Sequence, residues 1–503
     1  MKGKRIVLSA DRTLMSHYRD NMLFGFIATF PAEKIPPFIY KSIFCPSVEF
    51  NKATGEAMVA PLGLRRVEGG LLKEYGRDEV FIAHPDHIEK AIGEGTEIVG
   101  LNVMDPRGIG PVPSALTQGK MTPINRISFR NLCYRLKNLR EMKGYRFKVV
   151  VGGSGAWQFS FSSKEREDYG IDHVVIGEVD DKIGDICKDI VEGRAREVIF
   201  TRTNTIMDIP YIPGPTTNGC IEAMRGCGRG CDFCDPNLRM KRDFPVERLK
   251  EEASINLRYG ITSIWLQSEE ILLYGLDNSE MRPNRDAIVH LFSELKSLPN
   301  VNYVAAIHLT FSSAMADPEC IAKIREINNF NASRWTGVQI GLETASPALI
   351  RRHMPYKVKP FTPEEWPWLV REGIKLLNEN YFFVANTLII GLPGEQDDDV
   401  KETIELVKEL DGMATVVAPM FYTDYHDPSR SLQGERMSRA QWELYFRCWH
   451  LNAKTVARWM AYGTLHFSPV ARMVANAFGK LGTWYVLRLI RDGAKKYAGV
   501  YLN

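Results

Sequence analysis

The sequence predicts an α/β protein built on two parallel sheets, with a helical segment at its C-terminus. Short β-branched strands alternate with helical patterns on both sides of a polar, proline-containing stretch at 201–218. Near-continuous apolar strands with helices between them are typical of parallel sheets that are covered on both faces. The polar stretch has the composition of an extended linker. We therefore expect three parts, which span residues 1–205, 206–430 and 431–503.

The first part has the pattern of a Rossmann-like sheet, with helices such as 127–143 and 181–193 between some of its strands. The expected strands are 5–9, 80–83, 98–103, 148–153, 173–177 and 197–200. Sheets of this kind bind ligands at the carboxyl ends of their strands. Glycine-containing loops follow three successive strands, at 105–113, 152–157 and 177–181. Glycine lets a large flat ligand approach the backbone, so the loops indicate a ligand platform, although tight βα turns would use the same residues.

The second part has the pattern of an incomplete βα barrel, which begins at a cysteine-containing loop and would hold six strands. After that loop, strands are expected at 263–267, 302–309, 337–343, 382–393 and 415–422. Helices are expected around them at 246–258, 284–297, 317–327, 363–379 and 397–410. Barrels of this kind carry their active face at the strand C-termini. Besides the cysteine loop, the loops expected there are 267–270, 341–346, 389–395 and 423–428.

Three cysteines give the strongest chemical signal in the chain. Cys227, Cys231 and Cys234 are separated by three and then two residues in the stretch EAMRGCGRGCDFCDP. Three thiolates can hold three irons of a 4Fe–4S cube and leave the fourth iron open. The flanking glycines let the backbone wrap around a compact cluster, and Phe233 is placed to shield one face from water. A four-cysteine zinc site is the alternative, but Cys220 makes a poor second pair for it.

Composition argues against several other classes of protein. Nine cysteines in 503 residues are sparse, and most lie singly in apolar stretches, so no disulfide framework is expected. The net charge of +3 is too small to suggest nucleic-acid binding. No apolar run reaches membrane-spanning length. The N-terminus, MKGKRIVLSAD, lacks a secretory pattern, and we expect a cytoplasmic protein with reduced thiols.

With these residues in view, the chain resembles the radical S-adenosylmethionine (SAM) superfamily over roughly residues 1–430. More narrowly, it resembles the branch with an N-terminal cobalamin-binding domain. The RGCxxxCxFC loop, the strand-end acids, GLETAS and LIIGLPGE occur in the order that this branch shows. The stretches APLGL, VVVGGSGA and DHVVIGEVDD are similar to its cobalamin domain. The resemblance implies a cobalamin-dependent radical SAM methyltransferase.

The resemblance also implies roles for residues in the barrel loops. The three cysteines would hold the cluster, and SAM would chelate its open iron. Glu269, with Ser268 or Glu270, would bind the SAM amino group, because an ammonium needs a carboxylate or hydroxyl partner. A solvated helix cap is the alternative for the two acids. Glu343 and Ser346 would face the ribose hydroxyls.

Two further sets of contacts are expected on the same face. The backbone at Gly391 would pass close to the adenine of SAM. The loop after the last strand would supply three side chains to the substrate: Tyr422, Tyr425 and His426. Ordinary loop packing is the alternative for these side chains.

The cobalamin site lacks one common signature, Asp-x-His-x-x-Gly. Members of the resembled branch bind cobalamin with no histidine below the metal, so the loop after 98–103 would cover the lower face, with Asp105 and Arg107 as candidates. A domain that keeps the fold but has lost the cofactor is the alternative. The expected cobalamin contacts are Leu62, Gly63, Asp105, Arg107, Gly108, Gly152, Gly153, Ser154, Gly155, Gly177 and Glu178.

The resembled branch implies the chemistry. Cleavage of SAM yields a deoxyadenosyl radical that removes hydrogen from an unactivated carbon, and methylcobalamin supplies a methyl radical equivalent. An external electron donor is therefore an expected partner. Similarity of the opening stretch DRTLMSHYRDNMLFGFIATFPAEKIPPFIYKSIFCP to methanogen proteins of this branch implies a protein substrate. That substrate would be a glutamine in the α-subunit of methyl-coenzyme M reductase, although no motif identifies it.

The C-terminal segment suggests an alternative substrate. From Ser438 onward it contains ten basic residues and two acids, with apolar residues at helical spacing. Such a segment could dock an acidic protein surface or a lipid headgroup, or could simply present a solvated face. Its basic and aromatic character, including Trp459 and Trp484, makes a lipid or small molecule the alternative substrate. A non-catalytic cobalamin carrier is the remaining function class.

Overall fold

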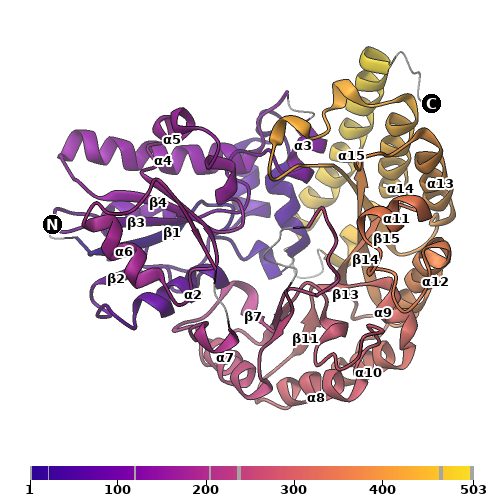
Figure 1. The fold of residues 1–503 in the computed structure, drawn as a ribbon, viewed down its shortest axis with the longest axis horizontal. Coiled ribbons are helices and arrows are strands. Elements are labelled where there is room, and N and C mark those ends of the chain that lie inside the picture. Colours follow the sequence, from indigo (N-terminus) through magenta and orange to yellow (C-terminus); the bar gives the residue numbers. More distant parts are fainter. Residues whose placement is uncertain are drawn as a thin grey trace. The chain divides into compact units, whose positions relative to one another are not determined.

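The computed structural model describes residues 3–20, 22–117, 120–202, 205–234, 240–463 and 468–498. It divides into two compact units (Figure 1). Unit 1 consists of Met1–Gly110, Lys120–Ile221 and Glu251–Thr262. Unit 2 consists of Pro111–Gly119, Glu222–Lys250 and Ser263–Asn503, so the C-terminal helices cluster with the barrel.

Unit 1 contains a six-stranded parallel sheet, in the order β2-β1-β3-β4-β5-β6. The strands lie where the sequence predicts them: β1 Ile6–Ala10, β2 Val80–Ile82, β3 Ile98–Asn102, β4 Lys148–Gly152, β5 His173–Gly177 and β6 Val198–Thr201. The helices of this unit are α1 Pro37–Ile39, α2 Leu62–Leu71, α4 Ile124–Lys143, α5 Ser163–Tyr169 and α6 Ile183–Val191. This strand order is that of a doubly wound sheet, and the Rossmann-like prediction is confirmed.

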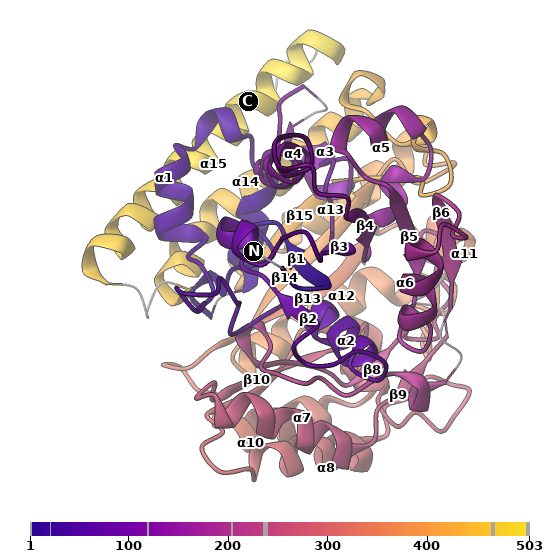
Figure 2. The ribbon, with the colours of Figure 1, turned by 90° about the vertical axis from the view of Figure 1, so that its left-hand side faces the viewer.

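Both faces of this sheet are covered, because successive side chains of a strand point to opposite sides. Val7 of β1 packs in a cluster with Phe129 and Leu132 of α4. Its neighbours Ile6 and Leu8 pack in a second cluster with α2 and α6. Figures 1 and 2 show α4 and α2 on opposite faces of the sheet. The near-continuous apolar strands are therefore explained by burial on two sides.

Seven described strands form a partial barrel and belong to unit 2, except for Cys220 and Ile221 at the start of the first strand, which cluster with unit 1. The two sheets of the barrel have the orders β11-β10-β7 and β12-β13-β14-β15. The strands are β7 Cys220–Glu222, β10 Ser263–Gln267, β11 Tyr303–Ala306, β12 His308–Leu309, β13 Thr336–Glu343, β14 Phe382–Ile390 and β15 Thr415–Phe421. The stretch expected as one strand at 302–309 is interrupted at Ile307. The Ile307 N–H donates to the Leu266 carbonyl and the Ile307 carbonyl accepts from the Gln339 N–H, so this residue joins the two sheets.

Helices alternate with these strands, as the sequence predicts. They are α7 Val246–Arg258, α8 Arg285–Lys296, α10 Pro318–Asn328, α12 Trp366–Glu379 and α13 Asp397–Glu409. Three short elements were not expected from the sequence: α3 Pro111–Thr117, α9 Phe311–Ala316 and α11 Pro347–His353. A two-stranded antiparallel pair, β8 Met224–Arg225 and β9 Arg242–Asp243, was also not expected.

The C-terminal helices α14 Arg439–Gly463 and α15 Pro469–Ala498 run side by side (Figures 1 and 2). Helix α14 packs on the last strand of the barrel, β15. The side-chain amide of Asn452 accepts from the Val417 N–H and donates to the Val417 carbonyl, both at 2.7 Å. Among the described residues, neither these helices nor any other is apolar enough over sufficient length to cross a membrane.

Glu395 connects the loop after β14 to α14, and this contact gives a pH prediction. Its carboxylate accepts from the Gly391 N–H at 2.9 Å and from the Gln441 amide at 2.7 Å. Burial raises the pKa of Glu395 to about 7 from the ordinary glutamate value of 4.5. The contribution of this carboxyl to the free energy of unfolding is therefore fully present below about pH 4.5 and is lost as the pH rises through about 7.

We expect Glu395→Gln to remove this pH dependence. As the pH rises through that range, the wild type should lose up to about 3 kcal/mol of unfolding free energy relative to the variant. Urea denaturation of the apo chain at a series of pH values would measure it. Glu405→Gln on the exposed side of α13 is the control and should follow the wild-type profile. Parallel profiles for Glu395→Gln and the wild type would contradict the prediction.

Candidate functional site

The cysteine loop is closed at its base by the short pair β8 and β9. Three glycines in this loop, Gly226, Gly228 and Gly230, have φ values of 74°, 78° and 68°. Only glycine adopts this left-handed conformation at little cost. These turns wind the chain tightly enough that Cys227, Cys231 and Cys234 line one pocket of about 360 Å³.

The pocket lies at the carboxyl ends of the barrel strands. Its walls come from the cysteine loop, from β10, β12, β13 and β14, from the residues that follow β10 and β12, and from one residue after α11. The lining residues are Cys227, Arg229, Gly230, Cys231, Phe233, Cys234, Gln267, Glu269, Glu270, His308, Leu309, Thr310, Gln339, Ile340, Gly341, Glu343, Lys357 and Thr387.

The donor set of this pocket fits a cluster better than a single ion. Within the described ranges, no three His, Cys, Asp or Glu side chains are close enough together to hold one metal ion. In a cube each cysteine binds a different iron, so its ligands need not converge on one point. Burial raises the pKa of the Cys227 thiol, and it raises that of Cys231 to about 11. The thiolates would therefore form together with the bound metal.

Arg229 anchors the cysteine loop to the barrel. This side chain is only 1% exposed. Its Nε donates to the Glu270 carboxylate at 2.7 Å, and its other nitrogens donate to the Lys357 carbonyl at 3.0 Å and to Ser313 Oγ at 2.7 Å. The second oxygen of Glu270 accepts from Thr310 Oγ1 at 2.5 Å. Glu270 is therefore engaged with the protein itself, although the sequence suggested it for the SAM amino group.

A second anchor joins the loop to α11. The Asp232 N–H donates to the His353 carbonyl at 3.0 Å. The Asp232 carboxylate lies 2.8 Å from His353 Nδ1, and His353 Nε2 lies 2.9 Å from the Pro393 carbonyl. His353 was not identified from the sequence, since a lone histidine at the end of a seven-residue helix carries no recognisable signal.

Glu269 lies in the pocket wall, next to the start of the cysteine loop. One carboxylate oxygen accepts from the Gly226 N–H at 2.6 Å. Burial raises the pKa of Glu269 to about 7, and the nearby charge of Glu222 adds to this effect. A half-buried carboxyl with a raised pKa gains from a cationic partner, and the expected contact of Glu269 with an ammonium group stays a prediction.

Glu343 and Lys357 form a buried ion pair in the same pocket, with Nζ and Oε1 2.6 Å apart. Glu343 has a φ of 62°, and the register of β13 against β14 shifts at this point. A Cβ at Gly341 would lie 1.9 Å from the Glu343 carboxylate and 2.3 Å from Lys357 Nζ, so only glycine leaves room for the pair. Burial lowers the pKa of Lys357, but the charges of Glu343 and Cys231 outweigh burial, and the pKa is raised overall.

Neutral polar side chains line the pocket from β10, β12, β13 and β14: Gln267, His308, Gln339 and Thr387. His308 Nδ1 lies 2.8 Å from the Ser268 carbonyl, and Nε2 lies 3.2 Å from the Gln339 amide. Because a carbonyl only accepts, Nδ1 must carry a proton. Burial lowers the pKa of His308, which favours the neutral ring. The sequence analysis did not single out these residues, because each is an isolated polar residue in an apolar strand.

Several residues expected at the site do not line this pocket. Ser268 is fully buried, and its hydroxyl has no hydrogen-bond partner among the described residues. Ser346 caps α11 by accepting from the Leu349 N–H, and its hydroxyl also donates to Asp399. At Gly391, with a φ of 86°, an added Cβ would meet the side chain of Leu432, so this glycine is explained by loop packing.

The three residues suggested for the substrate also lie outside the lining of the pocket. Tyr422 packs with Phe233 against the apolar cluster of Leu349, Ile389 and Leu392. Phe233 lines the pocket, whereas Tyr422 is not among its lining residues. Tyr425 is half-buried and His426 is exposed.

In unit 1, the two residues expected below the cobalt, Asp105 and Arg107, are engaged with other protein groups. The carboxylate of the half-buried Asp105 accepts from the Ile109 and Gly110 N–H groups and from the Gln158 amide at 2.6 Å. The Arg107 guanidinium donates to the Gln158 carbonyl at 2.8 Å and pairs with Glu165. These contacts hold the loop after β3 against the segment after β4.

The glycines at the carboxyl edge of this sheet fall into two groups. An added Cβ would collide with backbone or proline atoms in the first group: Gly108, Gly153, Gly155 and Gly177. At Gly63 and Gly152 the nearest atoms would be 3.8 and 3.9 Å away, so these two positions have room. Gly63, Gly153 and Ser154 are exposed, and Leu62 and Glu178 are half-buried. Tight packing explains the first group, and the exposed positions leave an accessible edge.

The buried ion pair of Glu343 and Lys357 leads to a prediction. We expect Lys357→Met to lower the free energy of unfolding of the apo chain by about 3–5 kcal/mol, because a buried carboxylate loses its partner. The double variant Lys357→Met, Glu343→Met should lose less, since it removes both charges. Urea denaturation followed by circular dichroism measures both. Lys359→Met, a half-buried lysine two residues further on, is the control. Equal losses in the single and double variants would show that the pair is not coupled.

Residues 221–407 match the family model described as Radical SAM superfamily. A threonylcarbamoyladenosine tRNA methylthiotransferase from Xenopus laevis is 23% identical over 276 residues, which cover 52% of this chain and 45% of that protein. The ribosomal protein uS12 methylthiotransferase RimO from Prosthecochloris aestuarii is 26% identical over 192 residues, which cover 38% of this chain and 40% of that protein. The matched region thus spans less than half of each of these two relatives.

Two solved structures share the fold over most of the chain. The cobalamin-dependent S-adenosylmethionine radical enzyme OxsB, with aqua-cobalamin bound, has a TM-score of 0.58 at 13% identity, covering 97% of this chain and 72% of that one. The radical S-adenosylmethionine methyltransferase TsrM from Kitasatospora setae, with cobalamin and a [4Fe-4S] cluster bound, has a TM-score of 0.53 at 16% identity, covering 84% and 73%. Residues 221–407 therefore form a radical SAM domain, in a chain whose fold is that of cobalamin-dependent radical SAM enzymes.

Proposed function

We propose that the chain is a cobalamin-dependent radical SAM C-methyltransferase that methylates an unactivated sp3 carbon of a protein residue. The observation that carries this proposal is the pocket of the radical SAM domain. Three cysteines from one loop line it, no fourth cysteine is among its described lining residues, and the carboxylates of Glu269, Glu270 and Glu343 line the same space. This arrangement suits a cluster with one open iron and a ligand that carries an ammonium and hydroxyl groups.

The residues of the pocket divide the work of holding the cofactors. Cys227, Cys231 and Cys234 would hold the 4Fe–4S cluster. Glu269 would accept the ammonium of SAM, and Glu343, held in place by Lys357, would accept its hydroxyls. When bound, the cluster, SAM and cobalamin together supply the one-electron chemistry and the methyl group. The protein positions these groups and excludes water and competing hydrogen donors, and an external electron donor completes the system.

Unit 1 would bind cobalamin at the carboxyl edge of its sheet. Its fold supports this, since parallel sheets of this kind bind ligands at that edge. The accessible positions Leu62, Gly63, Gly152, Ser154 and Glu178 are the proposed contacts. The loop of Asp105 and Arg107, which is fixed by hydrogen bonds to Gln158, would cover the lower face of the cofactor.

The proposed substrate is a glutamine in the α-subunit of methyl-coenzyme M reductase. The similarity of the opening stretch to methanogen proteins of the resembled branch supports this choice. We further propose that the enzyme acts in an oxygen-poor cytoplasm. All nine cysteines are free thiols, and an open iron would be sensitive to oxygen.

The function is tested by an anaerobic assay with CD₃-labelled SAM. The reconstituted chain is incubated with a reductant, cobalamin and a peptide that contains the target glutamine, and the products are read by mass spectrometry. We expect labelled methyl transfer to carbon that depends on cobalamin. Transfer that persists without cobalamin would contradict the mechanism. Methylation of a lipid extract but not of the peptide would replace the protein substrate by a lipid.

The cluster ligands have a matched control within the chain. We expect Cys231→Ala to lose the absorbance of the reconstituted cluster, because the cube loses one of its three thiolates. The rate of SAM cleavage should fall by at least about two orders of magnitude. Cys220→Ser removes a cysteine that precedes the loop and does not line the pocket, and it should retain both. Equal loss in the two variants would indicate a four-cysteine site instead. Metal analysis of both proteins would distinguish iron from zinc.

A further inference from the structure

Two side-chain amides in the cysteine pocket offer hydrogen-bonding groups that the protein itself does not use. Gln267, at the end of β10, and Gln339, within β13, are half-buried and line the pocket. Within the described part of the chain, the Gln267 amide has no hydrogen-bond partner. One end of the Gln339 amide contacts His308, and its other end has no partner there. The charged side chains of the same pocket, by contrast, all contact other protein groups.

The register of the strands explains why these side chains lie together. His308 and Gln339 are register partners in the parallel strands β12 and β13, so their side chains project to the same side. His308 Nδ1 lies 2.8 Å from the carbonyl of Ser268, the residue that follows Gln267. Gln267, His308 and Gln339 therefore form one layer of the barrel interior, which we call the amide layer.

His308 determines which end of the Gln339 amide faces the pocket. Its Nδ1 donates to a carbonyl, so the neutral ring keeps only a lone pair at Nε2, 3.2 Å from the Gln339 amide. The two ends of a side-chain amide exchange by rotation and are assigned from their partners. Gln339 must therefore turn its NH2 group toward His308, which leaves its carbonyl oxygen for a ligand in the pocket.

The charges of the pocket favour an uncharged ligand at the amide layer. Glu270 is paired with Arg229, and Glu343 is paired with Lys357. The proposed function gives Glu269 to the ammonium of SAM. A further buried cation would then lack a carboxylate partner, and burial of an unpaired charge costs far more than burial of a hydrogen-bonded neutral group.

We propose that Gln339 and Gln267 form a subsite for a primary carboxamide of the substrate, with His308 as a positioning residue. The oxygen of Gln339 would accept from the NH2 group of that carboxamide, and the NH2 group of Gln267 would donate to its oxygen. A carboxylate has no hydrogen to donate to Gln339, and a site built to bind an N–H group rejects the analogue that lacks it. This inference rests on the proposed function, and it names the residues that would distinguish glutamine from glutamate in the substrate.

The distance to the proposed SAM contacts suits a glutamine side chain. The Glu343 carboxylate lies at the level of Gly341, where an added Cβ would be 1.9 Å from it. Gly341 is two residues beyond Gln339 on β13, which is about 7 Å along a strand. A glutamine side chain and one hydrogen bond together span a similar distance. A substrate carbon near SAM is therefore compatible with a carboxamide in the amide layer.

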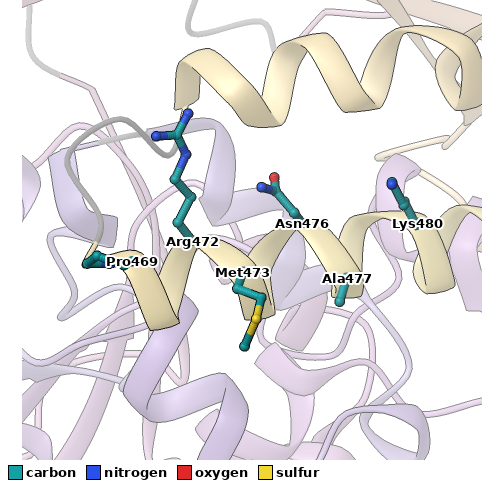
Figure 3. A pocket seen from close by; sticks show the side chains of 6 residues that line it. All are labelled: Pro469, Arg472, Met473, Asn476, Ala477 and Lys480. Atoms are coloured by element: carbon teal, nitrogen blue, oxygen red, sulfur yellow. The ribbon is translucent and has the colours of Figure 1, made fainter.

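A second cavity, beside α15, does not define one class of ligand. It has a volume of about 640 Å³ and is shown in Figure 3. Arg472, Asn476 and Lys480 project toward a neighbouring helix, while Met473 and Ala477 project away from it. The cations and the apolar side chains thus lie on different sides of α15.

Binding, measured without turnover, tests the carboxamide subsite. Three fluorescein-labelled peptides carry the proposed target sequence with Gln, Glu or Lys at the methylated position. Fluorescence anisotropy is measured anaerobically with the reconstituted chain, SAM and cobalamin, in the absence of a reductant. We expect the Gln peptide to bind at least about tenfold more tightly than either of the other two peptides.

Variants of the amide layer locate the subsite. Gln339→Leu and Gln267→Leu should each weaken binding of the Gln peptide at least about tenfold. His308→Phe keeps a ring but removes the lone pair, so the Gln339 amide is free to present either end. This variant should still bind the Gln peptide but prefer it over the Glu peptide by no more than about threefold, which a merely structural role would not produce.

Gln433→Leu is the matched control, because this glutamine is exposed and does not line the pocket. It should bind all three peptides like the wild type. Thermal unfolding followed by circular dichroism shows that each variant is folded. Equilibrium dialysis with radiolabelled SAM should give unchanged SAM binding in every variant.

Several outcomes would overturn the carboxamide subsite. These are failure of the Gln peptide to bind, equal or tighter binding of the Glu or Lys peptide, and a preference for Gln that Gln339→Leu leaves intact. Weaker binding of SAM to Gln339→Leu, with an unchanged peptide preference, would assign the amide layer to the adenine of SAM. The proposed function fails separately: selective binding of the Gln peptide without methyl transfer in the CD₃ assay would exclude the transfer but keep the subsite.

Discussion

The cysteine pocket depends on the buried ion pair between Arg229 and Glu270. Arg229 belongs to the cysteine loop, while Glu270 follows β10, and the guanidinium also donates to the Lys357 carbonyl. One side chain therefore ties together three segments that are far apart in the sequence. A buried ion pair adds little net stability compared with well-packed apolar residues, but its geometry is strict. Its main effect here is to place the loop, and with it the three thiols, in one position relative to the barrel.

The sequence was sufficient for the parts of the fold that depend on local pattern. Long apolar strands, helical periodicity and the cysteine triplet each appear within one short window, and the structure places them as predicted. Lys357, His353 and the antiparallel pair of β8 and β9 could not be found in this way. Lys357 and His353 meet the cysteine loop across more than a hundred residues, and strands of two residues have no periodicity to detect.

Some residues were recognisable but had more than one possible role. Ser346 precedes a proline at the start of a helix, which is the pattern of an N-cap, and the structure uses it in that way. Four of the glycines suggested for cobalamin fill positions where a Cβ would meet neighbouring atoms, so loop packing alone accounts for them. A glycine-rich loop at a strand end thus identifies the edge where a ligand would bind, but the structure is needed to separate the glycines that leave space from those that allow close packing.

The amide of Asn452 has a consequence for the open side of the barrel. Strand β15 is the last in its sheet, and the N–H and C=O of Val417 point away from β14 toward α14. Asn452 binds both groups, as the backbone of a neighbouring strand would. At this point the helix blocks the addition of a further strand from another molecule. An incomplete barrel can in this way remain open for its ligands without offering this part of its edge as a template for aggregation.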